Sequence, residues 1–470
     1  MGDPRWGCRL AKKGCSGART AVSRTSLNQR GGSMKKALLV LVVIVGFGAL
    51  ISAGCGKKGP AEIKVGVVMA QTGMFAGFGQ GGVFGVKAAV DDVNKQGGVD
   101  VGGKRMPITL VVVDSESDPN KAGSLAESLI VQDKVNFLCS GDEPPPMHAG
   151  VSHAADRYKI PYVTSVGPIE PWMGMRQETP TKWQYTWATG FAIVTPAAAG
   201  DFRDKPGYTV MDTWTAMLDL FGGKTNKTVG LIVADDPDGR GWYTLFGPAL
   251  TKLGYRVIGI DKSLGLLNLE TNDFSSVIKQ FKDAKVEVLW GNCPGPFFGA
   301  FWKQAHSLGF KPKMVCIGRA ALFYTDVAAW GGDLPWGVGT EIWWDSSFKD
   351  SPGIGGTTPM SLTERWTKEA KQPLSPGIGT GYRAVQILID AIQRAGTLDP
   401  EKVNAALAQT DVATIGQRVK FDENHFSRTP LVFGQWFKTD TPEKWELKVV
   451  FSKHDFIPAT GKALFPMPYE

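Results

Sequence analysis

The feature that most constrains this fold is a recurrence of short apolar strands, each accompanied by a helical pattern. In the first half of the chain, valine-rich strand candidates cover residues 63–70, 108–113, 135–140 and 162–165, and the pattern restarts at residues 228–234, 255–260, 286–291 and 313–318. This alternation is typical of parallel sheets with helices on both faces. We therefore predict an α/β fold with two Rossmann-like lobes, each built on a parallel sheet.

Two later segments need separate interpretation. Residues 382–395 predict a helix, because Val385, Leu388, Ile389 and Ile392 share one face and Gly396 can cap its end. Residues 168–189 form an insertion-like stretch that is rich in tryptophan, although exposed loops rarely use this residue. That stretch either packs across a lobe or lines a pocket.

The N-terminal region predicts export. Residues 1–33 lack apolar periodicity and are interpreted as a leader that is not native or is mis-started. Residues 34–54 combine two lysines, an apolar run and small residues, the order of a signal peptide. The run is shorter than the ~20 residues of a membrane span, which disfavours a permanent transmembrane anchor.

Cys55 follows this segment and marks the predicted start of the mature protein. The sequence Ser52-Ala53-Gly54-Cys55 resembles a bacterial lipoprotein cleavage box, which implies that Cys55 carries the lipid. Residues 55–61 would then be a short lipidated tether. The alternative is an ordinary secreted protein that is cleaved without lipidation.

The charge of the chain is concentrated in this leader. Residues 1–54 contain nine Lys and Arg against one Asp, which leaves 43 basic and 44 acidic residues for the 416 residues from Cys55 onward. A nearly neutral mature chain does not indicate a nucleic-acid partner. We expect a monomer that binds no nucleic acid.

The cysteines do not predict a disulfide framework. Only Cys139, Cys293 and Cys316 remain for the folded part, and an odd number excludes complete pairing. Cys293 and Cys316 end neighbouring strand candidates, so a bridge between them is conceivable. Two buried free thiols are the favoured alternative.

The familiar catalytic and cofactor motifs are weak or absent. The glycines of residues 77–82 fit GxGxxG, but they begin seven residues after the strand, and no acidic residue ends a strand about 20 residues later. His148 and His153 permit a metal site in principle, but such histidines more often belong to a helix surface or a satisfied core. We predict a binding protein with no catalytic residues, cofactor or metal, not an enzyme.

Polar residues at the ends of the strand candidates predict the ligand site. Open α/β sheets hold ligands at the carboxyl ends of their parallel strands. The candidates are Thr72, Ser140, Asp142, Thr164 and Ser165 from the first lobe, Asp238, Asn292 and Arg319 from the second, and Trp343 near the hinge as a stacking wall.

Three longer stretches resemble a known family. The segments IKVGVVMAQTGMFAGFGQGGVFGVKAAVDDVNKQGGV, VVVDSESDPNKAGSLAESLIVQDKVNFLCSG and TNDFSSVIKQFKDAKVEVLWGNC are similar to the branched-chain amino-acid (type I) periplasmic binding proteins of ABC transporters. The resemblance implies two lobes joined by three crossing strands that close on a ligand. It places residues 62–188 and 341–414 in lobe 1 and residues 189–340 and 415–470 in lobe 2, with the late helix on the first sheet.

The resemblance weakens at the positions that select the ligand. Pro145 stands where the family has a small hydroxyl residue, and Asp238-Gly239 replaces its Tyr-Gly. The implied function is that of an exported, lipid-anchored solute-binding protein, located in the periplasm or on the outer cell surface. It would capture an amino-acid-like, aromatic-acid or amide solute for the permease and ATPase subunits of an ABC importer. The alternatives are a ligand sensor that presents its closed form to a membrane receptor and, with less support, a Rossmann-like enzyme.

Overall fold

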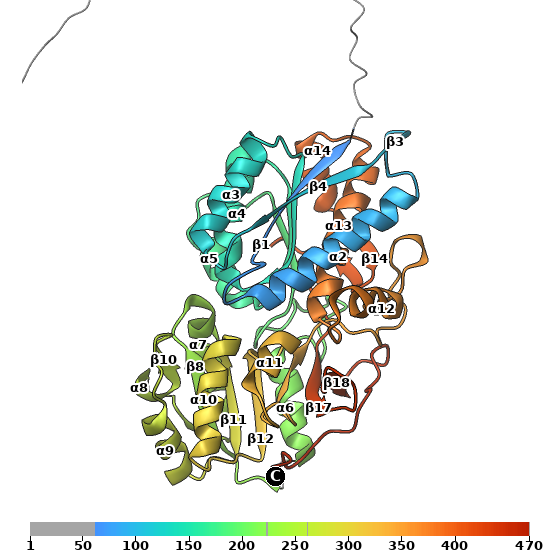
Figure 1. Ribbon diagram of the computed structural model, residues 1–470. Helices are drawn as coiled ribbons and strands as arrows, with labels where there is room; N and C mark the ends of the chain where they lie inside the picture. The colour runs from blue at the N-terminus through green and yellow to red at the C-terminus, as the bar shows by residue number, and fades with distance from the viewer. Residues whose placement is uncertain (1–61, 222–223, 261, 470) are drawn as a thin grey trace, which may run out of the picture. The chain divides into compact units, whose positions relative to one another are not determined.

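The computed structural model describes residues 62–221, 224–260 and 262–469, in which two open sheets carry packed helices (Figure 1). The predicted leader, signal peptide and Cys55 tether lie outside the described residues. No helix within the described ranges is long and apolar enough to cross a membrane.

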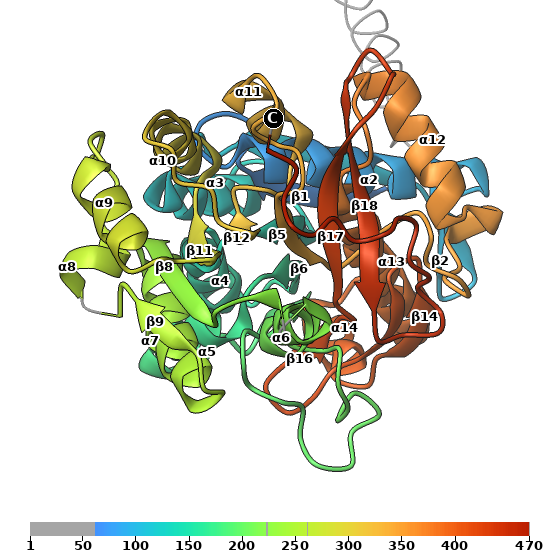
Figure 2. The ribbon, with the colours of Figure 1, turned by 90° about the horizontal axis from the view of Figure 1, so that it is seen from below.

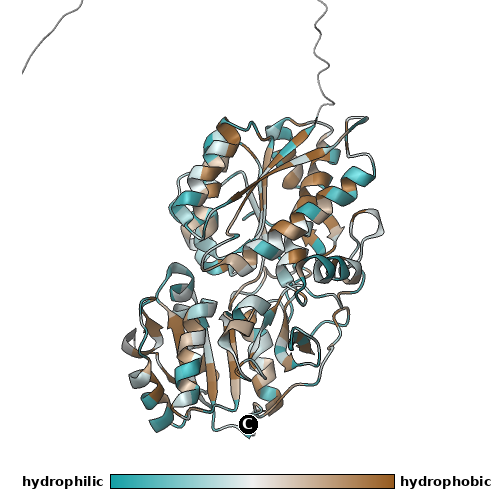
Figure 3. Ribbon diagram, viewed as in Figure 1, coloured by the Kyte–Doolittle hydropathy of each residue, from teal (hydrophilic) through white to brown (hydrophobic). Residues whose placement is uncertain are grey.

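The first sheet is parallel throughout and has the strand order β16-β7-β6-β5-β1-β4. Its strands are β1 (Ile63–Met69), β4 (Ile108–Asp114), β5 (Phe137–Glu143), β6 (Tyr162–Val166), β7 (Thr186–Gly190) and β16 (Phe426–Arg428). Strand β1 reads as a nearly continuous apolar run because helices cover both faces of the sheet. Figure 3 shows this as apolar strands between helices with mixed surfaces.

Helices α2 and α13 cover one face of the first sheet, and α3 and α4 cover the other (Figure 1). The lobe's helices are α2 (Ala76–Lys95), α3 (Pro119–Val131), α4 (Pro145–Tyr158), α5 (Ile169–Glu178), α12 (Pro359–Ala370), α13 (Pro376–Ala395) and α14 (Pro400–Leu407). The late helix therefore packs on the first sheet as predicted, and Gly396 ends it with a φ of 63°. It begins six residues earlier than expected, because glycines at 377, 379 and 381 interrupt the apolar pattern without breaking the helix.

The glycines of the GxGxxG segment serve close packing. A Cβ on Gly79 would lie 1.9 Å from the carbonyl oxygen of Ala70, and one on Gly85, three residues after the motif, would lie 2.0 Å from that of Ile378. Real side chains do not tolerate such approaches, so glycine lets α2 lie against the end of β1 and against α13. The motif is thus explained by packing and needs no nucleotide.

The second sheet is mixed. Its strand order is β10-β8-β11-β12-β13-β17-β18, and β9 pairs with β8 outside this path. The strands from β10 to β13 are parallel. Strands β17 and β18 are antiparallel to their neighbours. The strands are β8 (Thr228–Ala234), β9 (Arg256–Ile258), β10 (Leu266–Leu267), β11 (Val288–Cys293), β12 (Met314–Arg319), β13 (Gly339–Ile342), β17 (Val432–Lys438) and β18 (Trp445–Ser452). Figure 2 shows β17 and β18 as a long hairpin.

The remaining elements surround these sheets. Helices α6 (Val210–Phe221), α7 (Pro237–Lys252), α8 (Lys262–Gly265), α9 (Ser275–Asp283), α10 (Gly295–Ser307) and α11 (Tyr324–Trp330) belong to the second lobe, and a 3₁₀ turn covers Ile354–Gly356. Two small antiparallel pairs complete the fold, β2 (Val99–Val101) with β3 (Lys104–Met106) and β14 (Asp411–Thr414) with β15 (Gln417–Lys420).

The chain passes between the two sheets after β7, after β13 and after β16. The last passage differs from the expected lobe boundary at residue 415. Phe426 pairs with Ala188 and Arg428 with Gly190, so hydrogen bonding to β7 keeps the chain in the first sheet up to Arg428. A three-residue strand carries too little apolar pattern to be recognised from sequence.

The tryptophan-rich stretch belongs to the core of the first lobe. Trp172 and Trp183 are fully buried with ring centroids 5.6 Å apart, and Phe426 lies 6.3 Å from Trp172. Of the two alternatives left open by the sequence, packing across a lobe is therefore correct for these side chains. Cys139, Cys293 and Cys316 are all buried and free, so no bridge joins Cys293 to Cys316.

Candidate functional site between the lobes

Four polar side chains at the carboxyl edge of the second sheet form one connected network. Arg319 donates from Nε to Asn292 Oδ1 at 2.7 Å and from Nη1 to Asp236 Oδ2 at 2.8 Å. Its Nε also lies 3.0 Å from Asp238 Oδ2, which accepts a hydrogen bond from Asn292 Nδ2 at 3.1 Å. The three residues predicted in this lobe, Asp238, Asn292 and Arg319, are therefore brought together.

Local structure explains why this network forms. Asp236 caps α7 by accepting the Gly239 N–H at 2.7 Å, and Pro237 occupies the first helical turn, where a missing N–H costs nothing. Trp242, one turn later, donates its indole N–H to Asp238 Oδ1 at 3.0 Å. Burial alone would lower the pKa of Arg319, but the carboxylates of Asp236 and Asp238 hold it above its usual range.

The first-lobe edge is arranged differently. Asp142 and Ser165 are register partners at the ends of β5 and β6, and they are hydrogen-bonded through their side chains. Arg383 reaches the same point from α13 and donates from Nη2 to Ser165 Oγ at 3.2 Å. Among the described residues, no direct ion pair joins Asp142 to Arg383, and Arg383 Nε is buried with no hydrogen-bond partner.

Ser140 and Thr164 belong to a buried polar network in the first lobe. Ser140 Oγ lies 2.6 Å from Tyr162 Oη and 2.7 Å from Thr164 Oγ1. His148 completes it, with Nδ1 3.0 Å from Tyr162 Oη and Nε2 3.1 Å from the Glu143 carbonyl. Both ring nitrogens of His148 are thus engaged by protein groups, and the described residues contain no cluster of His, Cys, Asp and Glu suited to a metal ion.

Two other predicted residues lie apart from these networks. Thr72 is exposed, and its hydroxyl donates to Asp114 Oδ2 at 2.7 Å. Trp343 is buried after β13, with its ring centroid 5.2 Å from that of Phe191 and its indole N–H without a partner among the described residues.

The two edges face each other across a closed interface. Phe78 of α2 and Phe323, just before α11, have ring centroids 4.5 Å apart. A Cβ on Gly241 of α7 would lie 2.4 Å from Pro171 Cγ of α5. Burial is the largest cause that raises the pKa of Asp142, and the carboxylate of Asp238, which belongs to the other lobe, raises it as well.

Sequence reasoning missed Glu143, Glu341, Arg383 and Asp236. Arg383 was missed because it lies off the apolar face of α13, although packing against α2, β5 and β6 buries it completely. Glu143 accepts the Ala70 N–H at 2.7 Å, and Glu341 stands alone in a buried strand. A lone charge within an apolar element is the signal that was available for Glu341. Pro145, at the family's hydroxyl position, simply begins α4.

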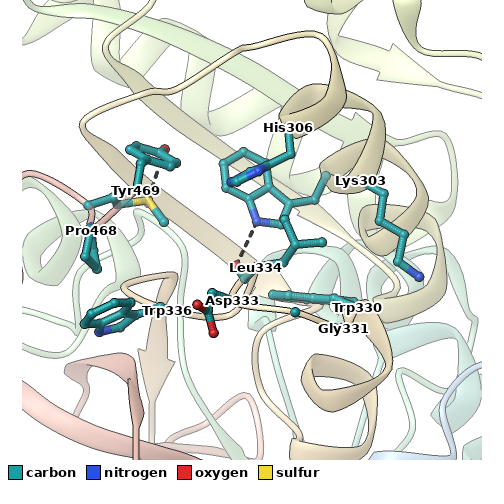
Figure 4. A pocket seen from close by; sticks show the side chains of 12 residues that line it. Lys303, His306, Trp330, Gly331, Asp333, Leu334, Trp336, Pro468 and Tyr469 are labelled. Atoms are coloured by element: carbon teal, nitrogen blue, oxygen red, sulfur yellow. Dashed lines mark hydrogen bonds between the residues drawn. The ribbon is translucent and has the colours of Figure 1, made fainter.

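A separate cavity of about 460 Å³ lies in the second lobe (Figure 4). Its lining includes Trp302, His306, Trp330, Asp333, Trp336 and Tyr469, and none of the predicted ligand residues. The carboxylate of Asp333 is already paired there with Lys438, which also lies over the Trp336 ring. We therefore place the candidate site between the lobes.

The comparison with known proteins identifies the fold and the family. The family model described as periplasmic binding protein matches residues 62–441. This chain belongs to the periplasmic binding protein family. It is 23% identical over 392 residues to the leucine-, isoleucine-, valine-, threonine- and alanine-binding protein of Pseudomonas aeruginosa, covering 80% of this chain and 91% of that one.

Solved structures agree with this periplasmic binding protein fold. The branched-chain amino acid transporter substrate-binding protein of Streptococcus pneumoniae, in complex with isoleucine, superposes with a TM-score of 0.63 at 17% identity, covering 86% of this chain and 100% of that one. A solute-binding protein of an ABC transporter from Rhodopseudomonas palustris, in complex with 3,4-dihydroxybenzoic acid, gives 0.62 at 18% identity, with 85% and 99% covered.

These findings confirm the predicted two-lobe α/β fold and the resemblance to the branched-chain amino-acid type of ABC-transporter binding protein. The family consists of binding proteins, which confirms the prediction that the chain is not an enzyme. Membership in it implies a location outside the cytoplasm.

Proposed function

We propose that this protein is a lipid-anchored solute-binding protein of an ABC importer, which captures a small amino-acid-like, aromatic-acid or amide solute between its lobes. The observation that supports the proposal is that both lobes bury polar side chains at their facing edges, Asp142 with Ser165 in the first lobe and Asp238 with Asn292 in the second. The carboxylate of Asp238 acts on that of Asp142 across the interface. Relatives with this fold are named for aliphatic amino acids or hold an aromatic acid, which supports these solute classes.

A thermal-shift screen of amino acids, aromatic acids and amides tests the binding function. A solute that binds only the folded state raises the melting temperature. At a concentration a hundredfold above its dissociation constant, it adds about 2.7 kcal/mol to the free energy of unfolding. Binding of nucleotides alone would contradict the proposal. Neighbouring permease and ATPase genes favour transport, whereas a neighbouring receptor kinase favours the sensing alternative.

The lipid anchor is tested through Cys55. The small residues before it and the short apolar segment support cleavage and lipidation at this position. We expect labelled palmitate to enter the expressed protein and to be lost in Cys55→Ser. Uptake of label by that variant would reject the anchor while leaving the solute-binding proposal intact.

A further inference from the structure

The interface between the lobes buries more acidic side chains than basic ones. Asp142 from the first lobe, Asp238 from the second and Glu341 from β13 influence one another electrostatically. The charged groups at this interface are the carboxyls of Asp142, Glu143, Asp236, Asp238 and Glu341 and the guanidiniums of Arg319 and Arg383. With all five carboxyls ionised, two guanidiniums would leave an excess of three negative charges.

Among the described residues, neither arginine forms a direct ion pair with Asp142 or Glu341. Arg319 is fully occupied by Asp236, Asp238 and Asn292. Glu341 accepts a hydrogen bond from the neighbouring Thr340 hydroxyl at 3.1 Å, and among the described residues it has no ion-pair partner. Asp142 likewise lacks a direct ion pair within the part of the chain that the structure describes.

Burial makes this excess costly. Burial, with a smaller contribution from the carboxylate of Asp238, raises the pKa of Asp142 and of Glu341 to about 8. Burial also raises the pKa of Asp238, to about 6, although the positive charge of Arg319 opposes this effect. Closing the lobes at neutral pH therefore requires either proton uptake or a positive charge from outside, because an unpaired buried carboxylate is strongly disfavoured.

Two further observations point to an organic ligand. The Trp242 ring lies beside Glu341 at Gly318, where a Cβ would be 3.1 Å from Trp242 Cη2 and 3.3 Å from Glu341 Oε1. An aromatic ring next to a carboxylate favours an organic cation. Beside Ser165, the buried Nε of Arg383 has no partner among the described residues, and such a donor requires an acceptor such as a carbonyl or hydroxyl oxygen.

We propose that the solute is an organic cation, an amine or amidine whose positive charge lies among Asp142, Asp238 and Glu341, with an acceptor group directed to Arg383. This inference rests on the proposed solute-binding function and narrows it. It favours basic amines and disfavours aromatic acids, whose negative charge would add to the excess already present.

Probes of equal shape and different charge test the proposal directly. We would titrate the full chain by calorimetry with benzamidine, benzamide and benzoate, and with butylamine, butyramide and butyrate. The expected result is that the cation of each set binds at least tenfold more tightly than the amide, and the acid most weakly. Tighter binding of an amide or an acid, or binding of isoleucine with no binding of either cation, overturns the cation proposal but leaves solute binding intact. If neither these probes nor amino acids bind, the solute-binding function itself fails.

The variant Glu341→Gln separates charge from shape. It keeps the side-chain volume and removes one carboxylate, so we expect at least tenfold weaker binding of the cationic probe and unchanged or tighter binding of its amide. Glu364→Gln, on the exposed face of α12, is the matched control and should leave both affinities unchanged. Equal losses for cation and amide in Glu341→Gln, with an unchanged melting temperature, would contradict the proposal.

Discussion

The two walls of the interlobe site each contain one buried arginine, but the surroundings of these arginines differ. Arg319 of the second lobe contacts two carboxylates and an amide, and they raise its pKa in spite of burial. For Arg383 of the first lobe, burial prevails over the attraction of Asp142 and lowers the pKa to about 10. The second-lobe wall is thus internally neutralised and preorganised, whereas the first-lobe wall is incomplete, because Arg383 Nε has no hydrogen-bond partner among the described residues.

The largest effect that would test this contrast is expected at Arg319. Arg319→Met leaves Asp236 and Asp238 buried without their cation, and removal of one partner from a buried ion pair costs about 3–5 kcal/mol. Urea denaturation of the purified chain should show a loss of this size. Arg240→Met, which removes an ion pair between an exposed arginine of α7 and Asp235, is the control and should not shift the midpoint. A loss below about 1 kcal/mol for Arg319→Met would mean that the network is not preorganised.

A smaller loss is expected at Arg383. Within the described part of the chain, its guanidinium has one bond to Ser165, a 3.4 Å contact to the Gly416 carbonyl and an unpaired Nε, so Arg383→Met removes few good interactions. We expect a cost of about 1–2 kcal/mol in the same urea experiment, since a buried donor that lacks its partner is itself unfavourable. If Arg319→Met and Arg383→Met lose the same free energy of unfolding, the two walls do not differ in the way described.

The fold was predictable because it depends on repeated local patterns. The apolar patterns of strand β1 and of the segment around Val385 and Leu388 predict buried elements, and Gly396 predicts a helix end. The second-lobe site was predictable for the same reason, since Asp238, Asn292 and Arg319 all follow strand candidates.

The first-lobe site was only partly predictable. Arg383 approaches Ser165 from a helix more than 200 residues away in the chain, and no local pattern encodes such a meeting. Ser140 and Thr164 also follow apolar runs, yet their hydroxyls bond to each other and to Tyr162. Sequence position fixes which strand end a residue occupies, but packing decides which neighbour its side chain meets.

The closed contact between the walls gives a third prediction. A Cβ on Gly77 would lie 2.6 Å from the Phe323 ring, so Gly77→Ala should hinder closure without disturbing either lobe. Overpacking of this kind costs about 1–3 kcal/mol, and we expect roughly tenfold weaker solute binding in calorimetry. Gly174→Ala in α5, where a new Cβ meets open space, is the control. Unchanged affinity in Gly77→Ala would indicate that binding does not require this contact between the lobes.

The smallest effect is expected at Thr72, and it bears on where the first-lobe wall ends. The Thr72 hydroxyl is exposed and donates to Asp114, whose Oδ1 already accepts the backbone N–H groups of Gln71 and Glu116 at 2.9 and 2.8 Å. These bonds keep the loop in place without the hydroxyl, so Thr72→Val should change solute affinity less than about twofold, within the ±0.5 kcal/mol typical of surface substitutions.

Ser165→Ala removes a partner of both Asp142 and Arg383 and should weaken binding about tenfold, the effect of losing roughly 1.4 kcal/mol. If calorimetry shows the larger loss for Thr72→Val, the solute contacts the end of β1, and the incomplete wall extends beyond Asp142 and Arg383.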